Sequence, residues 1–274
     1  MVRDFSEDDL KILYSAVLKK YGIDFSRYLQ FSFLRRLDRA FRNLGIDTCG
    51  HASVQLIENP VLFDRLLKEL SVEETEMFRD PGLWMDMKAR IIPEILRTGS
   101  KPKIWFVNST SGDHLISFLI LVNEKFRHAG FEIILSSESK TVIENVSAWN
   151  CNIKKYETSR QNYSQIIDGG DLKKYFSQSG TRYYYSREDL KNVNFQHRNI
   201  FRDSIPGDCN LIFLRNRLIY FDLESCDEIL TRASHALVKS GFLILGARER
   251  ITSGHINERF QVMNKEERIF RKIR

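Results

Sequence analysis

Apolar residues in the first part of the chain recur with the three-to-four-residue spacing of amphipathic helices. Ser6, followed by three acidic residues, is a typical helix start. Four apolar residues at helical spacing indicate a second helix: Leu34, Leu37, Phe41 and Leu44. Further helices are predicted at 52–57, at 61–70 and from Pro81, which suits a first helical turn, through Ile95. We therefore expect residues 1–98 to form an all-helical domain.

Residues 98–102 have the composition of a linker, and beyond them the pattern changes to short apolar runs separated by helical stretches. Short unbroken apolar runs are typical of parallel strands that are buried on both faces. The alternation predicts an α/β domain at 99–274 with helices on both faces of a parallel sheet. A tyrosine-rich segment within 181–199 suggests an extra strand or loop, and an antiparallel hairpin near Asn264 closes the chain. The predicted strands are 103–107, 132–136, 211–214 and 242–245, and the predicted helices are 113–128, 140–148 and 223–238.

Composition narrows the class of protein. No apolar run approaches the roughly 20 residues of a membrane span, and the N-terminus lacks the apolar core of a signal peptide, so we expect a cytoplasmic protein without membrane insertion. The four cysteines are widely spaced, which favours free thiols over disulfides or a zinc site. A net charge of +6 fits an acidic protein partner, an anionic ligand or simply a basic surface, and it is too modest to favour a nucleic-acid binder.

Polar residues follow the predicted strands at the ends where ligands bind in open α/β sheets. The run at 211–214 leads directly into Arg215 and Asn216, with Tyr220 shortly after. These residues are candidates to contact a cofactor or substrate. A strand end whose polar residues simply cap the next helix is the alternative that this segment leaves open.

The turn after the first predicted strand, at 108–114, has small residues and one glycine before a helix. Such a turn lets a ligand approach the backbone and the free N–H groups of the helix, but one glycine is no dinucleotide fingerprint. His114 beside Asp113 could be catalytic or a polar residue of the first helical turn. Glu138 ends the second strand, where an acid commonly accepts from ribose hydroxyls, although a helix-capping acid is equally compatible.

Two arginine groups are further candidates. Arg79, between an aromatic residue and a turn, could clamp a carboxylate or pair with Asp80. Three arginines at helical spacing, Arg35, Arg39 and Arg42, form either a solvated helix face or a docking face for an acidic helix.

Together these segments resemble the CheR family of chemotaxis receptor methyltransferases over residues 5–273. Thr75–Pro81 is similar to the family's threonine–Phe-Phe-Arg-Asp-Pro signature, with Met77 in place of one Phe. Phe195 to Asn199 is similar to its Phe-x-x-x-Asn segment, and 211–222 to its Leu-Ile-Phe-Cys-Arg-Asn-Val-Leu-Ile-Tyr-Phe-Asp stretch. The resemblance implies a Rossmann-like S-adenosylmethionine (SAM)-dependent methyltransferase fold with a small β insertion. It also implies that the acceptors are glutamate side chains of receptor helices and that the product is S-adenosylhomocysteine (SAH).

The resemblance also assigns roles to residues. It implies that Arg79 and Tyr220 lie beside the transferred methyl group. Arg35, Arg39 and Arg42 would contact the acidic helices of a chemoreceptor-like partner. No metal is expected, and family precedent favours a monomer. The implied cofactor contacts are Thr75, Arg79, Asp113, Glu138, Asn199, Ile200, Arg215 and Asn216.

Departures from the family pattern lie in the first turn. The family begins this turn with glycine and ends it with two acids, where this chain has Asn108, Asp113 and His114, and Glu138 replaces an aspartate. These changes could crowd the methionine part of SAM and weaken binding. Two hypotheses follow: an active protein-glutamate O-methyltransferase, or a catalytically weak or inactive scaffold of chemosensory signalling. The helical N-terminal domain argues against a small-molecule acceptor.

Overall fold

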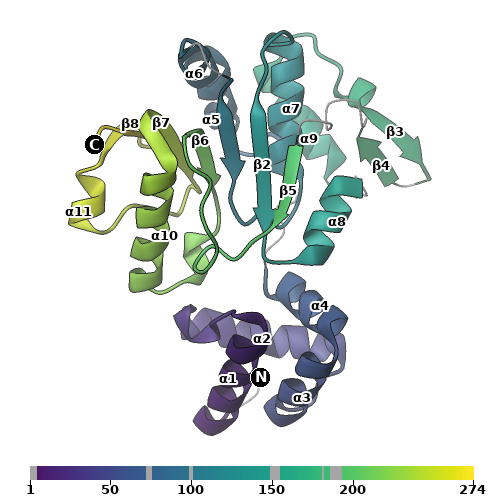
Figure 1. Ribbon diagram of the computed structural model, residues 1–274. Coiled ribbons are helices and arrows are strands. Elements are labelled where there is room, and N and C mark those ends of the chain that lie inside the picture. The colour runs from purple at the N-terminus through teal and green to yellow at the C-terminus, as the bar shows by residue number, and fades with distance from the viewer. Residues whose placement is uncertain (1–4, 72–75, 99–100, 149–154, 181, 186–192) are drawn as a thin grey trace.

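A seven-stranded sheet is the centre of the larger part of the molecule (Figure 1). The computed structural model describes residues 5–71, 76–98, 101–148, 155–180, 182–185 and 193–274. The sheet order is β5-β2-β1-β6-β7-β9-β8. The first five strands are parallel, β9 is antiparallel to β7, and β8 is antiparallel to β9. The strands are β1 (Lys103–Phe106), β2 (Glu132–Ser137), β5 (Val193–His197), β6 (Cys209–Leu214), β7 (Leu237–Leu245), β8 (Phe260–Asn264) and β9 (Ile269–Lys272).

Both faces of the sheet are covered, because successive side chains of a strand point to opposite sides. Ile104 and Phe106 belong to one core cluster, whereas Trp105 and Val107 belong to another. The second cluster is covered by α10 (Leu223–Ala236) and α11 (Gly254–Asn257). The first is covered by α5 (Pro81–Asp86), η2 (Met87–Ile91), α6 (Ile92–Leu96), α7 (Asp113–Lys125), α8 (Lys140–Ala148) and α9 (Tyr156–Ile166). The predicted α/β fold with a parallel sheet is confirmed.

Four helices form a separate layer with its own core beyond the carboxyl ends of the parallel strands (Figure 1). Ser6 accepts a hydrogen bond from the Asp9 N–H and starts the first helix, as predicted. Thr48 caps the third in the same way, so that helix begins at Cys49 rather than at residue 52. The helices are α1 (Glu7–Tyr21), α2 (Gln30–Leu44), α3 (Cys49–Glu58) and α4 (Pro60–Leu70), with η1 (Phe25–Arg27) between the first two.

The two hydrophobic cores place the boundary between the helical layer and the sheet earlier in the chain than the sequence predicted. The buried residues of the helical layer run from Leu13 to Leu70. The helices within 81–96 instead bury Leu83, Trp84 and Ile95 in the core of the sheet. We therefore propose a domain boundary between residues 70 and 77 in place of the expected boundary at 98 and 99.

The small β insertion also lies elsewhere than expected. It consists of β3 (Phe176–Ser179) and β4 (Arg182–Tyr185), which pair antiparallel. The expected range of 181–199 overlaps it only in β4. Residues 193–197 instead extend the large sheet, where Phe195 pairs with Leu135 and packs against the core. η3 (Leu172–Tyr175) leads into β3.

None of the helices within the described ranges combines the length and apolar character needed to cross a membrane.

Candidate functional site

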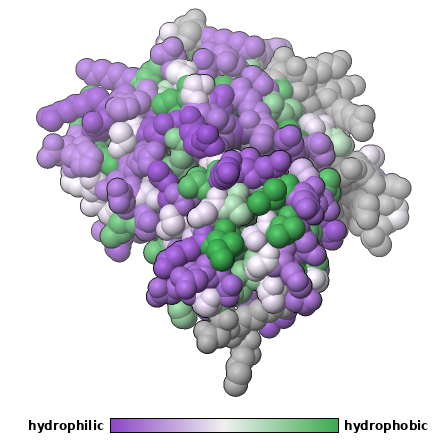
Figure 2. All heavy atoms as spheres, turned by 60° about the horizontal axis from the view of Figure 1, so that its bottom comes forward, coloured by the Kyte–Doolittle hydropathy of each residue, from purple (hydrophilic) through white to green (hydrophobic). Residues whose placement is uncertain are grey.

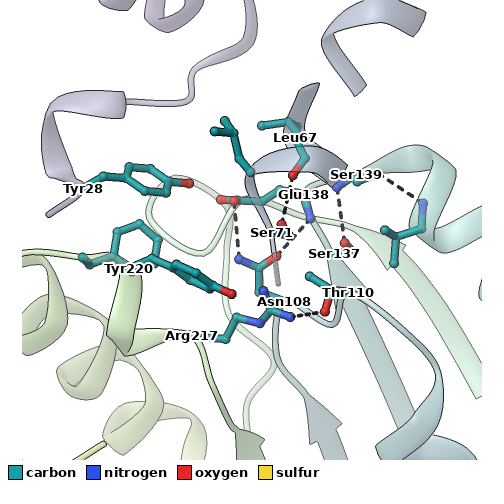
Figure 3. Close-up of a pocket in the computed structure, with 13 residues that line it drawn as sticks. Tyr28, Leu67, Ser71, Asn108, Thr110, Ser137, Glu138, Ser139, Arg217 and Tyr220 are labelled. Atoms are coloured by element: carbon teal, nitrogen blue, oxygen red, sulfur yellow. Dashed lines mark hydrogen bonds between the residues drawn. The ribbon is translucent and has the colours of Figure 1, made fainter. Parts of the chain in front are cut away.

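Two adjoining hollows lie where the carboxyl ends of the parallel strands meet the helical layer. We call them the inner pocket, a cavity of about 30 Å³, and the outer pocket, a cavity of about 480 Å³. Leu67 and Glu138 line both, so the two hollows meet at the end of β2. The inner pocket is shown in Figure 3. Its wall includes Asn108, Thr110, Arg217 and Tyr220, and the outer pocket's wall includes His197 and Asn199.

The turn after β1 and the end of β2 hold each other in place. Asn108 has a φ of 46°, a conformation that asparagine tolerates better than most residues. Its Nδ2 donates to Glu138 Oε2 at 3.4 Å, and the Glu138 N–H donates to Asn108 Oδ1 at 3.3 Å. The Ser109 N–H also donates to the Ser136 carbonyl at 2.8 Å. The side chain that replaces the family's glycine therefore turns toward Glu138.

Glu138 presents its carboxylate to the inner pocket between Asn108 and Tyr28 (Figure 3). Burial raises the pKa of Glu138 to about 7, against the opposing effects of the Asn108 hydrogen bond and the positive charge of Arg217. The Tyr28 hydroxyl points toward this carboxylate (Figure 3), and burial raises the pKa of Tyr28 as well. A half-buried acid at the end of the second strand is suited to accept hydrogen bonds from sugar hydroxyls.

A buried carboxylate shapes the loop after β6. Glu249 accepts hydrogen bonds from the backbone N–H groups of Gly246, Asn216 and Leu218 at 2.6, 2.8 and 2.6 Å. A Cβ on Gly246 would lie 2.5 Å from Asn216 Oδ1, so a side chain there would displace the loop. Asn216 itself has a φ of 56°. Glu249 is not among the predicted site residues, and its one signal in the sequence is that it is a lone acid just after the buried strand β7.

Arg215 is buried and belongs to a network behind the loop. It forms an ion pair with Asp80, and its Nη1 lies 3.5 Å from His114 Nε2. The neighbouring Arg79 points elsewhere: its side chain is 43% exposed, and its Nε is 3.8 Å from Glu76 Oε1. Neither arginine is among the described residues that line the two pockets.

Tyr220 is buried and packs against two guanidinium groups. Arg36 of α2 lies 4.6 Å and Arg217 lies 5.9 Å from the centre of its ring. Arg217 Nη2 also donates to Thr110 Oγ1 at 2.7 Å (Figure 3). The sequence did not single out Arg36 or Arg217, because helical spacing identifies a polar face without showing what lies against it.

Backbone hydrogen bonds attach the helical layer to this loop. The Leu29 N–H donates to the Tyr220 carbonyl at 2.8 Å, and the Asp222 N–H donates to the Arg27 carbonyl at 2.9 Å. On the other side, the carboxylate of Asp64 in α4 accepts from the N–H groups of Lys140 and Thr141 at the start of α8, at 2.8 and 2.9 Å. The helical layer therefore contributes walls to both pockets.

The predicted site residues separate into groups. Glu138, Asn199 and Tyr220 line the pockets. Thr75 lies outside the described residues, close in sequence to Ser71 of the inner pocket. Ile200 is buried in the sheet's second core cluster, and Asp113 begins α7. Asn199 also ties the two parts together, since its Nδ2 donates to the Gly22 carbonyl at 3.3 Å.

Among the described residues, no group of three His, Cys, Asp or Glu side chains is placed to hold a metal ion.

Comparison with known proteins agrees with this arrangement. The family model described as the CheR methyltransferase SAM-binding domain matches residues 73–269. A Pseudomonas putida protein named methyltransferase Cher3 is 26% identical, with 96% of each chain covered. A chemotaxis protein methyltransferase of Listeria innocua is 22% identical, covering 92% of this chain and 93% of its own. Among solved structures, the N-methyltransferase NodS of Bradyrhizobium japonicum with SAH is similar at a TM-score of 0.39 and 12% identity, over 86% of this chain and 98% of that one. The family match spans most of the chain, including the sheet, Glu138 and the loop that carries Tyr220, and so the chain belongs to the CheR methyltransferase family.

Proposed function

We propose that this protein is a SAM-dependent methyltransferase of chemosensory signalling that methylates glutamate side chains of a chemoreceptor-like partner. The observation that carries the proposal is the position of Glu138. Its carboxylate lies where the two pockets meet, at the end of the second parallel strand and within the region that the family model matches.

The residues around the strand ends fit SAM. Glu138 offers acceptor oxygens for the ribose hydroxyls, as acids at this position do in related α/β folds. The larger outer pocket, with His197 and Asn199 in its wall, has room for the adenine. The sulfur end would lie toward the inner pocket, and the side chains of its wall would have to move to admit it, because that cavity measures only about 30 Å³. We further propose that Thr75, Arg79, Asp113, Ile200, Arg215 and Asn216 contribute contacts or hold the loops that make them.

When bound, SAM supplies an electrophilic methyl group on a sulfonium. In the transfer, a carboxylate oxygen of the acceptor would bond to the methyl carbon while the carbon–sulfur bond would break and its electron pair would go to sulfur. Neutral SAH and a methyl ester result, and no proton is released, so the site needs no general base. We propose that Tyr220 and its neighbours align the acceptor with the methyl group. We keep Arg79 as a second candidate for this alignment.

An acidic helix suits the exposed face of α2 as the partner. Arg35, Arg39 and Arg42 are exposed there, and Arg42 Nη2 lies 2.8 Å from the buried Asp38 carboxylate. Exposed apolar side chains of Phe31 and Leu223 lie at the start of α2 and just after the Tyr220 loop. Figure 2 shows the helical end of the molecule, where hydrophobic side chains gather among mainly hydrophilic ones. An amphipathic acidic helix would match both kinds of side chain, and we propose that the protein acts on it as a cytoplasmic monomer without a metal.

A scaffold without catalytic activity is the second candidate, and one observation favours it. Asn108 and Arg217 both enter the inner pocket, where the family pattern has glycine and valine. If their side chains keep SAM out, the fold and the α2 face would still bind a partner.

Calorimetric titration with SAM and SAH tests the proposal. We expect micromolar binding that Glu138→Ala weakens by on the order of tenfold or more, because the ribose loses its acceptor. Glu132→Gln is the matched control, since Glu132 lies at the opposite end of the same strand and is exposed. Absence of binding at millimolar ligand would establish the scaffold instead. A radiolabelled methyl-transfer assay on a receptor cytoplasmic fragment, with glutamate or glutamine at its acceptor positions, then tests the substrate.

A further inference from the structure

Arg217 is a buried cation in the inner pocket. It stands where the corresponding stretch of the family has valine, and it is only 4% exposed. Its side chain rises from the loop after β6 and passes between Tyr220 and Asn108 (Figure 3). The hydrogen bond to Thr110 fixes one end of the guanidinium against the turn after β1.

After its hydrogen bond to Thr110, the guanidinium of Arg217 still has N–H groups that can donate. An arginine has five N–H donors, and buried donors nearly always have partners. Arg217 Nε is buried and lacks a hydrogen-bond partner among the described residues, and the same holds for Nε and Nη2 of Arg36. Both side chains pack over Tyr220. Three guanidinium N–H groups near the Tyr220 ring are therefore available to an acceptor that enters the pocket.

The charge of the pocket indicates what kind of acceptor fits. Of the described residues in its wall, Arg217 is the one cation and Glu138 the one acid. Glu138 has a pKa of about 7, so near neutral pH it carries only part of a negative charge. A second anion would offset the remaining positive charge of the two arginines.

Other arginines near the strand ends are already engaged. Arg215 is paired with Asp80, and Arg79 is directed toward Glu76. Arg217 is thus the guanidinium best placed to meet an acceptor that enters beside Tyr220.

We infer that Arg217 binds the side-chain carboxylate of the methyl acceptor against the Tyr220 ring and so selects a carboxylate over its amide. The inference rests on the proposed function and names its acceptor-binding residue. A planar guanidinium can hold both oxygens of a carboxylate. After transfer, the ester has lost its charge and one of these acceptors, so its contact with Arg217 weakens and the product leaves.

The test uses the full chain saturated with SAH. Two probes, N-acetyl-glutamate amide and N-acetyl-glutamine amide, have the same shape and differ in the charge of the side chain. Their affinities are measured by NMR titration for the wild type, Arg217→Val and Arg217→Lys. Arg127→Val is the control, because Arg127 is exposed near the opposite end of the sheet.

We expect the wild type to bind the glutamate probe about tenfold more tightly than the glutamine probe. Arg217→Val should remove this preference, Arg217→Lys should keep part of it, and Arg127→Val should keep all of it. The affinity for SAH should stay within about twofold in Arg127→Val, and the probes are titrated for each variant at an SAH concentration that saturates that variant.

Three results would overturn the inference while leaving the proposed function intact. The first is an unchanged preference in Arg217→Val. The second is weaker binding of SAH but not of 5′-methylthioadenosine, which would assign Arg217 to the methionine carboxylate of the cofactor. The third is markedly tighter SAM binding in Arg217→Val, which would show that Arg217 obstructs the cofactor. A wild type that binds no SAH would instead overturn the proposed function, and the inference with it.

Discussion

At the scale of single residues, the pairing of Asn108 with Glu138 is the main departure of this chain from its family's pattern. The asparagine occupies a position where backbone strain favours glycine, and its side chain compensates by bonding the acid at the end of β2. Asn108 and Glu138, which both differ from the family's residues, are therefore coupled through their hydrogen bonds. Their joint effect on the protonation of Glu138 can be measured.

Glu138 makes stability depend on pH. Its pKa is about 7 in the folded chain, against an ordinary value of 4.5. The folded state therefore holds this proton more tightly than the unfolded state, and the free energy of unfolding falls as pH rises between those values. Glu138→Gln cannot ionise, so we expect its Tm to exceed that of the wild type by a few degrees at pH 8 and to match it near pH 5. Calorimetric scans at both pH values check this, and equal differences at the two would contradict it.

Binding of SAH should show the opposite trend. The ionised carboxylate is the better acceptor for ribose hydroxyls, so affinity should rise by about tenfold from pH 6 to pH 8, across a pKa near 7. Asn108→Gly should move the midpoint of this rise to higher pH, because the Asn108 hydrogen bond lowers the pKa of Glu138. Titrations at several pH values measure the midpoint. A midpoint that Asn108→Gly leaves in place would show that the bond has no influence.

At the scale of elements, the loop after β6 depends on Glu249. Replacing this carboxylate by alanine leaves several buried backbone N–H groups without an acceptor. We expect Glu249→Ala to lower the free energy of unfolding by on the order of 3 kcal/mol, measured by urea denaturation. Glu258→Gln, at an exposed position of the same segment, should change it by less than about 0.5 kcal/mol. Similar losses in both variants would contradict a specific role for Glu249.

The elements themselves were largely predictable from local pattern. Pro81 begins a helix, the apolar runs form adjacent parallel strands, and Asn264 ends β8 of the closing hairpin. Several elements were missed, and for two of them the physical reason is clear. The helix α9 buries only Ser159, Tyr163 and Ile166 within a polar sequence. The edge strand β5 has no continuous apolar run, because one of its sides is unpaired.

The candidate site was also predictable only in part, because periodicity reports local structure and not contacts between distant residues. Periodicity marked Glu138 and Tyr220 as residues that follow strands, and both line the inner pocket. It could not show that Arg36 of the helical layer packs over Tyr220 or that Tyr28 packs against the neighbouring Phe221, since those contacts join residues far apart in the chain. The functional roles of all these residues remain predictions.

At the scale of the whole molecule, Asp64 links the helical layer to the sheet by capping α8. Asp64→Ala should cost about 1 kcal/mol, as the loss of a helix cap does. It should also speed amide hydrogen exchange at Lys140 and Thr141 while leaving exchange in α10 unchanged. Uniformly faster exchange would indicate general destabilisation instead of a local link.

The position of the outer pocket has a kinetic consequence. Its described wall comes from α1, α4, the residues that follow β2 and β5, and the start of α8, and no described residue of α2 contributes to it. A partner held on the arginine face of α2 would leave this route open, so spent cofactor could be exchanged for fresh cofactor without the partner leaving. We expect such an enzyme to work processively, adding several methyl groups in one encounter. Mass spectra taken early in the reaction should then show multiply methylated partner beside untouched partner, with few singly methylated molecules.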